Sequence, residues 1–148
     1  MYIFRVWSPP RGTKVIGMIY ICHGFTEHMA NYNGVGEFLS SKGFYCFGTD
    51  LVSHGFSDTA NGLPAFIPDF KECRDDIIDH IKHEIQMIEG KHYGVGKVPP
   101  LFIIGHSMGG MLSIRLVQDH PDLFKAMVLV GPLIYPGPSG VLRREILS

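Results

Sequence analysis

Residues 101–110 read LFIIGHSMGG, a short apolar run followed by glycines that flank a serine. The run Leu101–Ile104 predicts a strand buried on both faces of a sheet, and Met111–Val117 predicts a helix. Between them stands Gly105–Gly109, which has the pattern Gly-x-Ser-x-Gly. A buried strand, a tight turn and a helix in this order are typical of parallel α/β folds.

The same alternation of strand and helix continues on both sides of this segment. The expected core strands are Val15–Cys22, Phe44–Gly48 and Ala126–Val130, the expected edge strand is Tyr2–Trp7, and the expected helices cover residues 32–39 and 70–88. Residues 51–68 are rich in Gly, Ser and Pro and are expected to form a loop. We therefore predict an α/β protein with a mostly parallel sheet and helices on both faces.

The turn at Ser107 is the main candidate for chemistry. A strained strand-to-helix turn would push the Ser107 Oγ out above the sheet, with His106 as part of the supporting turn. Side chains at Gly105 and Gly109 would collide with the neighbouring helix and strand. The helix N-terminus adds a partial positive charge where an oxyanion would form. Ser107 is therefore the candidate nucleophile, and the alternative is an ordinary glycine-rich connection.

A second element agrees with this interpretation. The expected strand Val15–Cys22 is followed by His23-Gly24-Phe25, and the loop after that strand gives a backbone N–H to an oxyanion hole in this architecture. The N–H groups of Phe25 and Met108 are the predicted donors, and Gly24 lets the backbone turn sharply. We interpret His23 as a turn residue whose ring hydrogen-bonds the backbone.

Composition limits the class of protein. The chain has 148 residues and a formal net charge of −1, which suits one domain and argues against nucleic acid as a partner, since nucleic acid needs a basic face. Cys22, Cys46 and Cys73 cannot form a complete disulfide framework, so we expect free thiols in a reducing compartment. No apolar run approaches the roughly 20 residues of a membrane helix, and no secretory leader is visible. We expect a cytoplasmic protein, and peripheral association with membranes stays open.

Other polar groups give weaker signals. Asp76, His80 and His83 could share one helix stripe, but without a His-Glu-x-x-His arrangement we expect a solvated face and no metal site. Residues 90–97 resemble a phosphate loop with the wrong spacing. The Gly-x-Gly pairs of the chain lack the third glycine of a dinucleotide site. We therefore expect no cofactor.

Three motifs stand in register along the chain: HGFTEH at residues 23–28, DLVSHGFS at residues 50–57 and GHSMGG at residues 105–110. In order and rough spacing they resemble the monoglyceride lipase branch of the α/β-hydrolases, which includes lysophospholipase-like and serine aminopeptidase-like relatives. The resemblance runs over residues 2–135. One departure is Ser53, where that family usually has glycine, and it bears on the loop rather than on a catalytic role.

The resemblance implies a serine hydrolase that cleaves a small lipid ester, above all a monoacylglycerol. Ser107 would attack the ester carbonyl, and the N–H groups of Phe25 and Met108 would hold the oxyanion. Such enzymes carry the triad in the chain order Ser, Asp, His. An Asp–His pair from beyond residue 148 would activate Ser107, because an unactivated serine is a weak nucleophile at neutral pH.

The triad acid and base are expected to be missing from these residues. After the nucleophile the chain offers only Asp119 and Asp122 as Asp and only His120 as His, all around the end of the following helix. We therefore expect residues 1–148 to be a single incomplete α/β-hydrolase domain without the family's first strand and C-terminal strands, with a lid beginning at residues 132–148. The alternative is a non-catalytic truncated isoform, fragment or pseudoenzyme of the same fold. The oligomeric state stays open.

The motif at residues 50–57 is expected to be structural. Asp50 ends a core strand, and His54-Gly55 makes a turn near the pocket mouth. The alternative is that Asp50 or His54 replaces a missing triad member, which would reverse the chain order of the triad. A ring nitrogen of His54 within hydrogen-bond reach of the Ser107 Oγ would favour that alternative.

Overall fold

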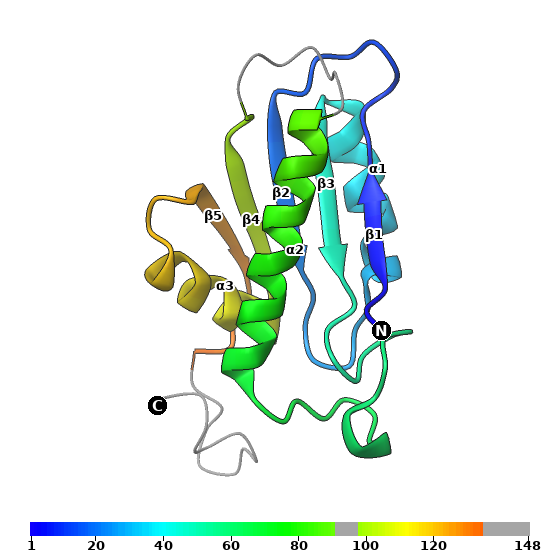
Figure 1. The fold of residues 1–148 in the computed structure, drawn as a ribbon, viewed down its shortest axis with the longest axis vertical. Coiled ribbons are helices and arrows are strands. Elements are labelled where there is room, and N and C mark those ends of the chain that lie inside the picture. The colour runs from blue at the N-terminus through cyan, green and yellow to red at the C-terminus, as the bar shows by residue number, and fades with distance from the viewer. Residues whose placement is uncertain (91–97, 135–148) are drawn as a thin grey trace.

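A computed structural model describes residues 1–90 and 98–134, and within them a five-stranded sheet is covered by helices (Figure 1). The strands are β1 (Phe4–Trp7), β2 (Gly17–Cys22), β3 (Phe44–Thr49), β4 (Leu101–His106) and β5 (Phe124–Val130). Across the sheet they follow the order β1-β3-β2-β4-β5. Their bounds lie close to those predicted from the apolar runs.

The pairing of the strands is mostly parallel, as predicted. β1 runs antiparallel to β3 at one edge, and the pairs β2–β3, β2–β4 and β4–β5 are parallel. The central strand β2 is buried along its whole length, as expected of a strand covered on both faces. The register places Cys22 beside Gly105, so the loops that follow β2 and β4 leave the sheet side by side.

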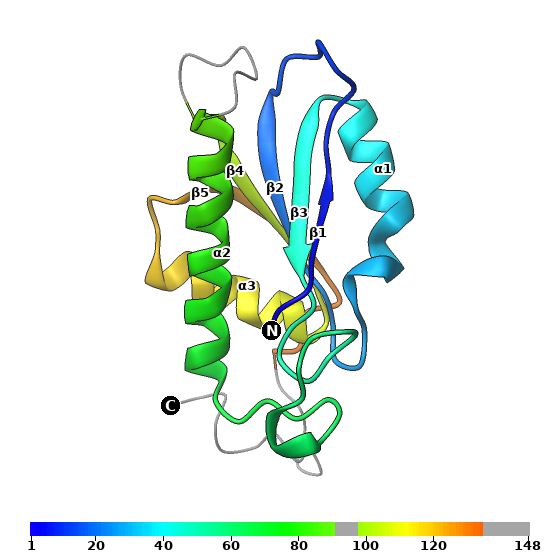
Figure 2. The ribbon, with the colours of Figure 1, turned by 45° about the vertical axis from the view of Figure 1, so that its right-hand side comes forward.

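Helices cover both faces of the sheet, as predicted (Figure 2). They are α1 (Asn33–Ser41), α2 (Phe70–Gly90) and α3 (Met108–Asp119), with 3₁₀ turns η1 (Met29–Tyr32) and η2 (Ala60–Gly62). α1 packs on one face, and α2 and α3 pack on the other. α3 begins three residues before the predicted start, because the turn at Ser107 leads directly into the helix.

Each face of the sheet has its own apolar core. The larger core joins Tyr20 and Phe47 of the sheet to Ile81 of α2 and Leu112 of α3, and all four side chains are fully buried. The smaller core under α1 includes Ile21. Burial of apolar surface is the main favourable term in folding, so these two layers hold the carboxyl edge of the sheet in place.

The apolar periodicity of α2 is confirmed, but the expectation of a solvated polar stripe was wrong for His80. Asp76 and His83 are exposed, whereas His80 is 6% exposed. Its Nδ1 lies 2.5 Å from the Thr49 Oγ1, and its Nε2 lies 3.7 Å from a carboxylate oxygen of Glu84. The hydrogen bond to Thr49 satisfies Nδ1 in the core, as buried polar groups require, whereas Nε2 has no hydrogen-bond partner among the described residues.

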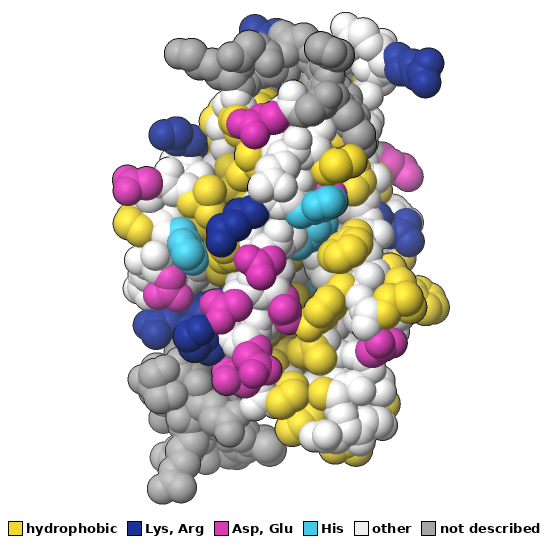
Figure 3. Space-filling model, in the orientation of Figure 1, with side chains coloured by type: hydrophobic (Ala, Val, Ile, Leu, Met, Phe, Trp, Pro, Cys, Tyr) yellow, Lys and Arg dark blue, Asp and Glu magenta, His cyan; other side chains and the backbone are white. Residues whose placement is uncertain are grey.

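The surface shows where the described sheet has open edges. Figure 3 shows charged side chains along the outward face of α2 and apolar side chains beside it on the side of β1, where Phe4 is 54% exposed. Ala126–Val130 was expected to be a core strand of the family fold on which the sheet of this chain would end with an open edge. β5 is the edge of the described sheet, with β4 as its described partner, and Val128 and Val130 are about half exposed, so the expected edge is confirmed.

Two further sequence expectations concern the lid and membrane-spanning helices. Of the predicted lid beginning at residues 132–148, only 132–134 lie within the described residues. Among the helices of residues 1–90 and 98–134, none is long and apolar enough to cross a bilayer.

α1 approaches β1 closely at Gly36. A Cβ placed on Gly36 would lie 2.2 Å from Cδ2 of the buried Trp7 ring, far inside van der Waals contact. Gly34, in the same helix, has open space around such a Cβ. Past the end of the helix Gly43 has φ +96°, the left-handed conformation that glycine commonly supplies there, as predicted.

The two glycines of α1 make a matched test of this packing. Gly36→Ala is expected to destabilise the fold by about 1–3 kcal/mol because the methyl group overpacks against Trp7. Gly34→Ala is expected to be neutral or stabilising by up to about 1 kcal/mol, since alanine favours helix. Urea unfolding of both variants measures the difference, and equal stabilities would contradict the close packing of α1 on Trp7.

Candidate active site at the ends of β2 and β4

Ser107 occupies the turn between β4 and α3 with φ 51° and ψ −116°. This combination is strained for a residue that carries a side chain. Backbone hydrogen bonds hold the turn: the Ser107 N–H donates to the Val130 carbonyl at 3.0 Å, and the Leu133 N–H donates to the Ser107 carbonyl at 2.8 Å. The predicted outlying conformation of Ser107 is confirmed.

The two flanking glycines are required by close packing, as predicted. A Cβ on Gly105 would lie 2.3 Å from the Ser113 Oγ of α3. A Cβ on Gly109 would lie 2.1 Å from the carbonyl oxygen of Cys22 at the end of β2. Neither contact is possible for real atoms, so glycine at both positions lets α3 start directly behind the sheet.

The loop after β2 lies directly against this turn. A Cβ on Gly24 would lie 3.2 Å from the Ser107 Cβ and 3.1 Å from Nδ1 of His106. The parallel register of β2 and β4 accounts for this, because it places His23 and Gly24 beside His106 and Ser107. The fold thus brings together two segments that are more than 80 residues apart in the sequence.

The orientation of the Gly24–Phe25 peptide is fixed by hydrogen bonds to the Gly24 carbonyl. The ring Nδ1 of His23 lies 2.8 Å from this oxygen, and the Glu27 N–H donates to it at 3.2 Å. A trans peptide is planar, so its N–H points opposite to its carbonyl. The direction of the Phe25 N–H is therefore set. The roles of Phe25 and Met108 as oxyanion donors stay predictions.

Met108 is the first residue of α3, and its side chain is fully buried. The first N–H groups of a helix have no partner within the helix, so the Met108 N–H is of the kind that an oxyanion hole uses. Phe25 differs in exposure, because its side chain is about half exposed and its ring packs beside His54 at a centroid distance of 5.7 Å.

His23 is a buried connector, and its predicted role as a turn residue is confirmed. Its Nε2 accepts a hydrogen bond from the Leu51 N–H at 2.9 Å. An N–H group can only donate, so in the neutral ring the proton sits on Nδ1 and is donated to Gly24. Burial is the main reason that the pKa of His23 is lowered to about 4, and the ring stays neutral at physiological pH.

His23 is expected to weaken the fold in mild acid. Its folded pKa of about 4 lies below the ordinary value of 6.5 for histidine, so the unfolded chain binds more protons between these values. The stability that this group contributes is complete above pH 6.5 and falls by up to about 1.4 kcal/mol per pH unit as the pH decreases toward 4. Unfolding free energies of His23→Asn between pH 7 and 4 should show a flatter slope, whereas exposed His83→Asn should keep the original slope. Equal slopes for the two variants would contradict this assignment.

Asp50 is a structural anchor, as predicted for its motif. One carboxylate oxygen accepts the Met29 N–H at 2.7 Å, and the other accepts the Phe56 N–H at 3.0 Å. His54 is buried, and its Nδ1 lies 2.8 Å from the Val52 carbonyl. Within residues 1–90 and 98–134, the His54 Nε2 has no hydrogen-bond partner. The alternative in which His54 activates the nucleophile therefore lacks the hydrogen bond that it requires.

A local hydrogen bond accounts for Ser53 at a position where the family usually has glycine. Its φ is 62°, a left-handed conformation that favours glycine. The Ser53 Oγ accepts a hydrogen bond from the Ala60 N–H at 2.8 Å. That bond partly offsets the strain of serine in this turn.

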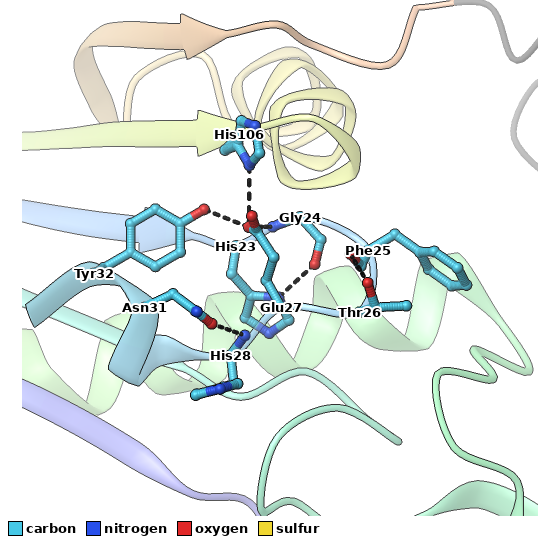
Figure 4. Close-up of polar contacts among 9 residues, drawn as sticks. All are labelled: His23, Gly24, Phe25, Thr26, Glu27, His28, Asn31, Tyr32 and His106. Carbon is cyan, nitrogen blue, oxygen red and sulfur yellow. Dashed lines mark hydrogen bonds and ion pairs between the residues drawn. The ribbon is translucent and has the colours of Figure 1, made fainter.

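Glu27 and Tyr32 complete the site, and the sequence interpretation assigned neither a role (Figure 4). One carboxylate oxygen of Glu27 accepts the Gly24 N–H at 2.7 Å and the Tyr32 hydroxyl at 2.6 Å. The same oxygen lies 3.0 Å from Nδ1 of His106 at the end of β4. The only signal in the sequence was that Glu27 lies in the same short motif as Gly24, and a motif does not reveal which donors a carboxylate meets.

The three triad candidates that follow Ser107 in the sequence, Asp119, His120 and Asp122, lie away from it. His120 caps the far end of α3, and a helix of 12 residues is about 18 Å long. Asp119 pairs with the Arg74 Nε at 3.3 Å, and Asp122 follows the helix and is exposed. Their predicted location away from the nucleophile is confirmed.

Metal sites and cavities are the other places where the described residues could bind a ligand. No group of three or more His, Cys, Asp or Glu is placed to hold a metal ion in residues 1–90 and 98–134. A cavity of about 330 Å³ lies between β1, β3 and α2 and is lined by Phe4, Leu51, Ile77 and His80 among others. None of the residues of the Ser107 turn lines it.

Replacing Ser107 tests the strain directly. Ser107→Gly is expected to be more stable than Ser107→Ala by about 1 kcal/mol. Relief of the outlying backbone conformation stabilises the glycine variant by about 1–3 kcal/mol, and the greater entropy of glycine in the unfolded chain offsets part of this gain. Both variants remove the hydroxyl, so their difference isolates the Cβ. Unfolding curves measure it, and a less stable Ser107→Gly would show that the backbone is not strained.

Comparison with known proteins places this geometry in a family. A family model described as serine aminopeptidase, S33, matches residues 13–146. A monoglyceride lipase homolog of Monkeypox virus is 36% identical over 134 residues, which cover 90% of this chain and 44% of that protein. Monoglyceride lipase of Mus musculus is 30% identical over 148 residues, which cover 99% of this chain and 45% of that protein. The chain thus spans less than half the length of these relatives.

A solved structure shares the fold. A soluble variant of monoglyceride lipase from Saccharomyces cerevisiae, determined with a substrate analog, matches with a TM-score of 0.76 at 23% identity, over 90% of this chain and 42% of that chain. The mostly parallel sheet and the strained Ser107 turn define an α/β-hydrolase fold. The chain belongs to the serine aminopeptidase S33 family and is monoglyceride lipase-like. The predicted family is confirmed.

Proposed function

We propose that residues 1–148 carry the nucleophile and the oxyanion hole of a serine hydrolase that acts on a lipid ester, a monoacylglycerol. The observation that carries this proposal is the contact of the strained Ser107 turn with the loop after β2, where a Cβ on Gly24 would lie 3.2 Å from the Ser107 Cβ. The contact supports a site in which the N–H groups of Phe25 and Met108 serve one serine.

The substrate class is supported by the relatives and by the local surface. The mouse relative is named a monoglyceride lipase, and the viral relative is named its homolog. An acyl chain needs apolar surface near the nucleophile. Phe25 is 47% exposed on the loop beside Ser107, which suits contact with such a chain.

The proposed reaction proceeds through an acyl-enzyme. The Ser107 Oγ attacks the ester carbonyl carbon while a general base takes its proton. The oxyanion that forms accepts hydrogen bonds from the N–H groups of Phe25 and Met108, beside the positive end of α3. The ester C–O bond then breaks, and glycerol leaves with the proton. Water attacks the acyl group by the same steps, which releases the fatty acid and restores Ser107.

The base is assigned to an Asp–His pair outside residues 1–148. Within the described residues the rings of His23 and His54 bond backbone groups, and His106 faces Glu27. The relatives are more than twice as long as the matched segment. Residues 1–148 would then form one part of an α/β-hydrolase domain.

Two proteins test this proposal. Residues 1–148 alone should hydrolyse a monoacylglycerol only weakly, because loss of the base leaves about 10³–10⁴-fold catalysis over water. A chimaera of residues 1–148 with the part of the mouse relative that follows the matched segment should react rapidly with a fluorophosphonate probe and hydrolyse the ester. Both reactions should be lost in Ser107→Ala.

The controls separate the outcomes. A folded chimaera, judged by a cooperative melt, that is neither labelled nor active would contradict the proposal and favour a non-catalytic protein. Rapid labelling of residues 1–148 alone, lost in Ser107→Ala, would show that a base comes from within these residues. His23, His28 and His54 would then be substituted first.

A further inference from the structure

We infer that Glu27 is a positioning residue of this site: its carboxylate ties the loop that carries Phe25 to the turn that carries Ser107 and thereby sets the distance between the two oxyanion donors. The inference rests on the proposed function of Ser107. Glu27 acts through its neighbours and has no contact with the reacting atoms.

The geometry of the carboxylate connects three elements. Its oxygen accepts the Gly24 N–H at 2.7 Å from the loop after β2 and the Tyr32 hydroxyl at 2.6 Å from η1. It also lies 3.0 Å from the ring Nδ1 of His106. Gly24 directly precedes Phe25, and His106 directly precedes Ser107 and Met108. The carboxylate therefore bridges the segments that hold the two N–H donors (Figure 4).

The loop needs an external restraint because it is strained. Thr26 has φ 62°, a conformation that is a genuine outlier for a β-branched residue. Such a residue costs about 1–2 kcal/mol, so the turn would relax if its neighbours allowed it. Rotation of the peptides around Thr26 would break the hydrogen bond from the Glu27 N–H to the Gly24 carbonyl, one of the two bonds that fix the Gly24–Phe25 peptide and so the direction of the Phe25 N–H. Glu27, next in the chain, is anchored on both sides of the site and opposes this relaxation.

The charge state of Glu27 suits this role. Burial acts to raise the pKa of Glu27, but the hydrogen bonds from its three donors outweigh burial and lower the pKa to about 2. The carboxylate therefore remains an ionised acceptor at neutral pH, and charge-assisted hydrogen bonds are stronger and shorter than neutral ones.

A negative charge near an oxyanion hole has a cost, and this distinguishes positioning from direct catalysis. A free carboxylate would repel the developing oxyanion. Here the donor groups of Gly24, Tyr32 and His106 all face one carboxylate oxygen, which offsets its charge locally. The benefit must then come from placement of the donors, since an oxyanion hole works only when its N–H groups are held in advance.

Substitutions in the chimaera of residues 1–148 with the segment of the mouse relative test the inference. Glu27→Gln keeps the size of the side chain but removes its charge, and it should lower kcat for a monoacylglycerol by at least about tenfold, a fraction of the 10²–10³ lost with a whole donor. KM should change less than twofold, because the acyl site is intact. Tyr32→Phe, which removes one donor and nothing else, should give a smaller loss in the same direction. Glu37→Gln on the exposed face of α1 is the matched control and should behave as the wild type.

A second readout does not depend on catalysis. Amide hydrogen exchange of Gly24 should become at least tenfold faster in Glu27→Gln and stay unchanged in Glu37→Gln. An unchanged kcat in Glu27→Gln, or unchanged Gly24 exchange, would overturn the inference. A loss that appears only as a lower melting temperature, with normal kcat per folded molecule, would show a purely structural brace and would also overturn it.

The two readouts separate this inference from the proposed function. If the chimaera with wild-type residues 1–148 has no esterase activity but Gly24 exchange responds to Glu27→Gln, the proposed reaction fails and the carboxylate bridge stands. If the wild type is active and neither kcat nor Gly24 exchange responds, the reaction stands and the positioning role fails. Should Glu27→Gln fail to fold, Tyr32→Phe decides by the same two measurements.

Discussion

Close approach between the end of β2 and the start of α3 is the constraint on which the site depends. Gly109 packs so tightly that any Cβ would lie 2.1 Å from the Cys22 carbonyl oxygen. This contact keeps α3 directly behind the parallel pair β2–β4, whose register sets Cys22 beside Gly105. Because of it, the loop at Gly24 meets the turn at Ser107. A side chain at Gly109 would move the helix away and separate the two segments.

Strain and restraint occur together at this edge of the sheet. Ser107 and Thr26 both have positive φ, and they lie on the two segments that face each other. Each conformation is unfavourable alone, and each persists only because surrounding contacts fix it. The His23 ring holds the Gly24 carbonyl by a hydrogen bond, and the Glu27 carboxylate holds the Gly24 N–H by another. The result is a pair of backbone segments with little freedom, which is the property that a preorganised anion site requires.

Local patterns predicted the elements, and their failure at His80 has a physical cause. Apolar runs located all five described strands, and the three-to-four spacing located α2, because these patterns record which residues face a core. His80 was expected to be solvated since its neighbours on the helix are charged, but its partner Thr49 lies on β3, and helix periodicity contains no information about another element. β5 was expected to end the sheet, and within the described residues its strand partner is β4.

The sequence by itself determined the parallel α/β class, the family, and Ser107 as the candidate nucleophile, because the glycines around it and the flanking apolar segments are local and chemically specific. It also placed Gly24 and Phe25 in the neighbouring loop through their motif. Only the tertiary structure decided that the Glu27 carboxylate meets Gly24, Tyr32 and His106 at once. A carboxylate has many possible donors in a chain of this length, and the packing of β2 against β4 selects the ones that it reaches.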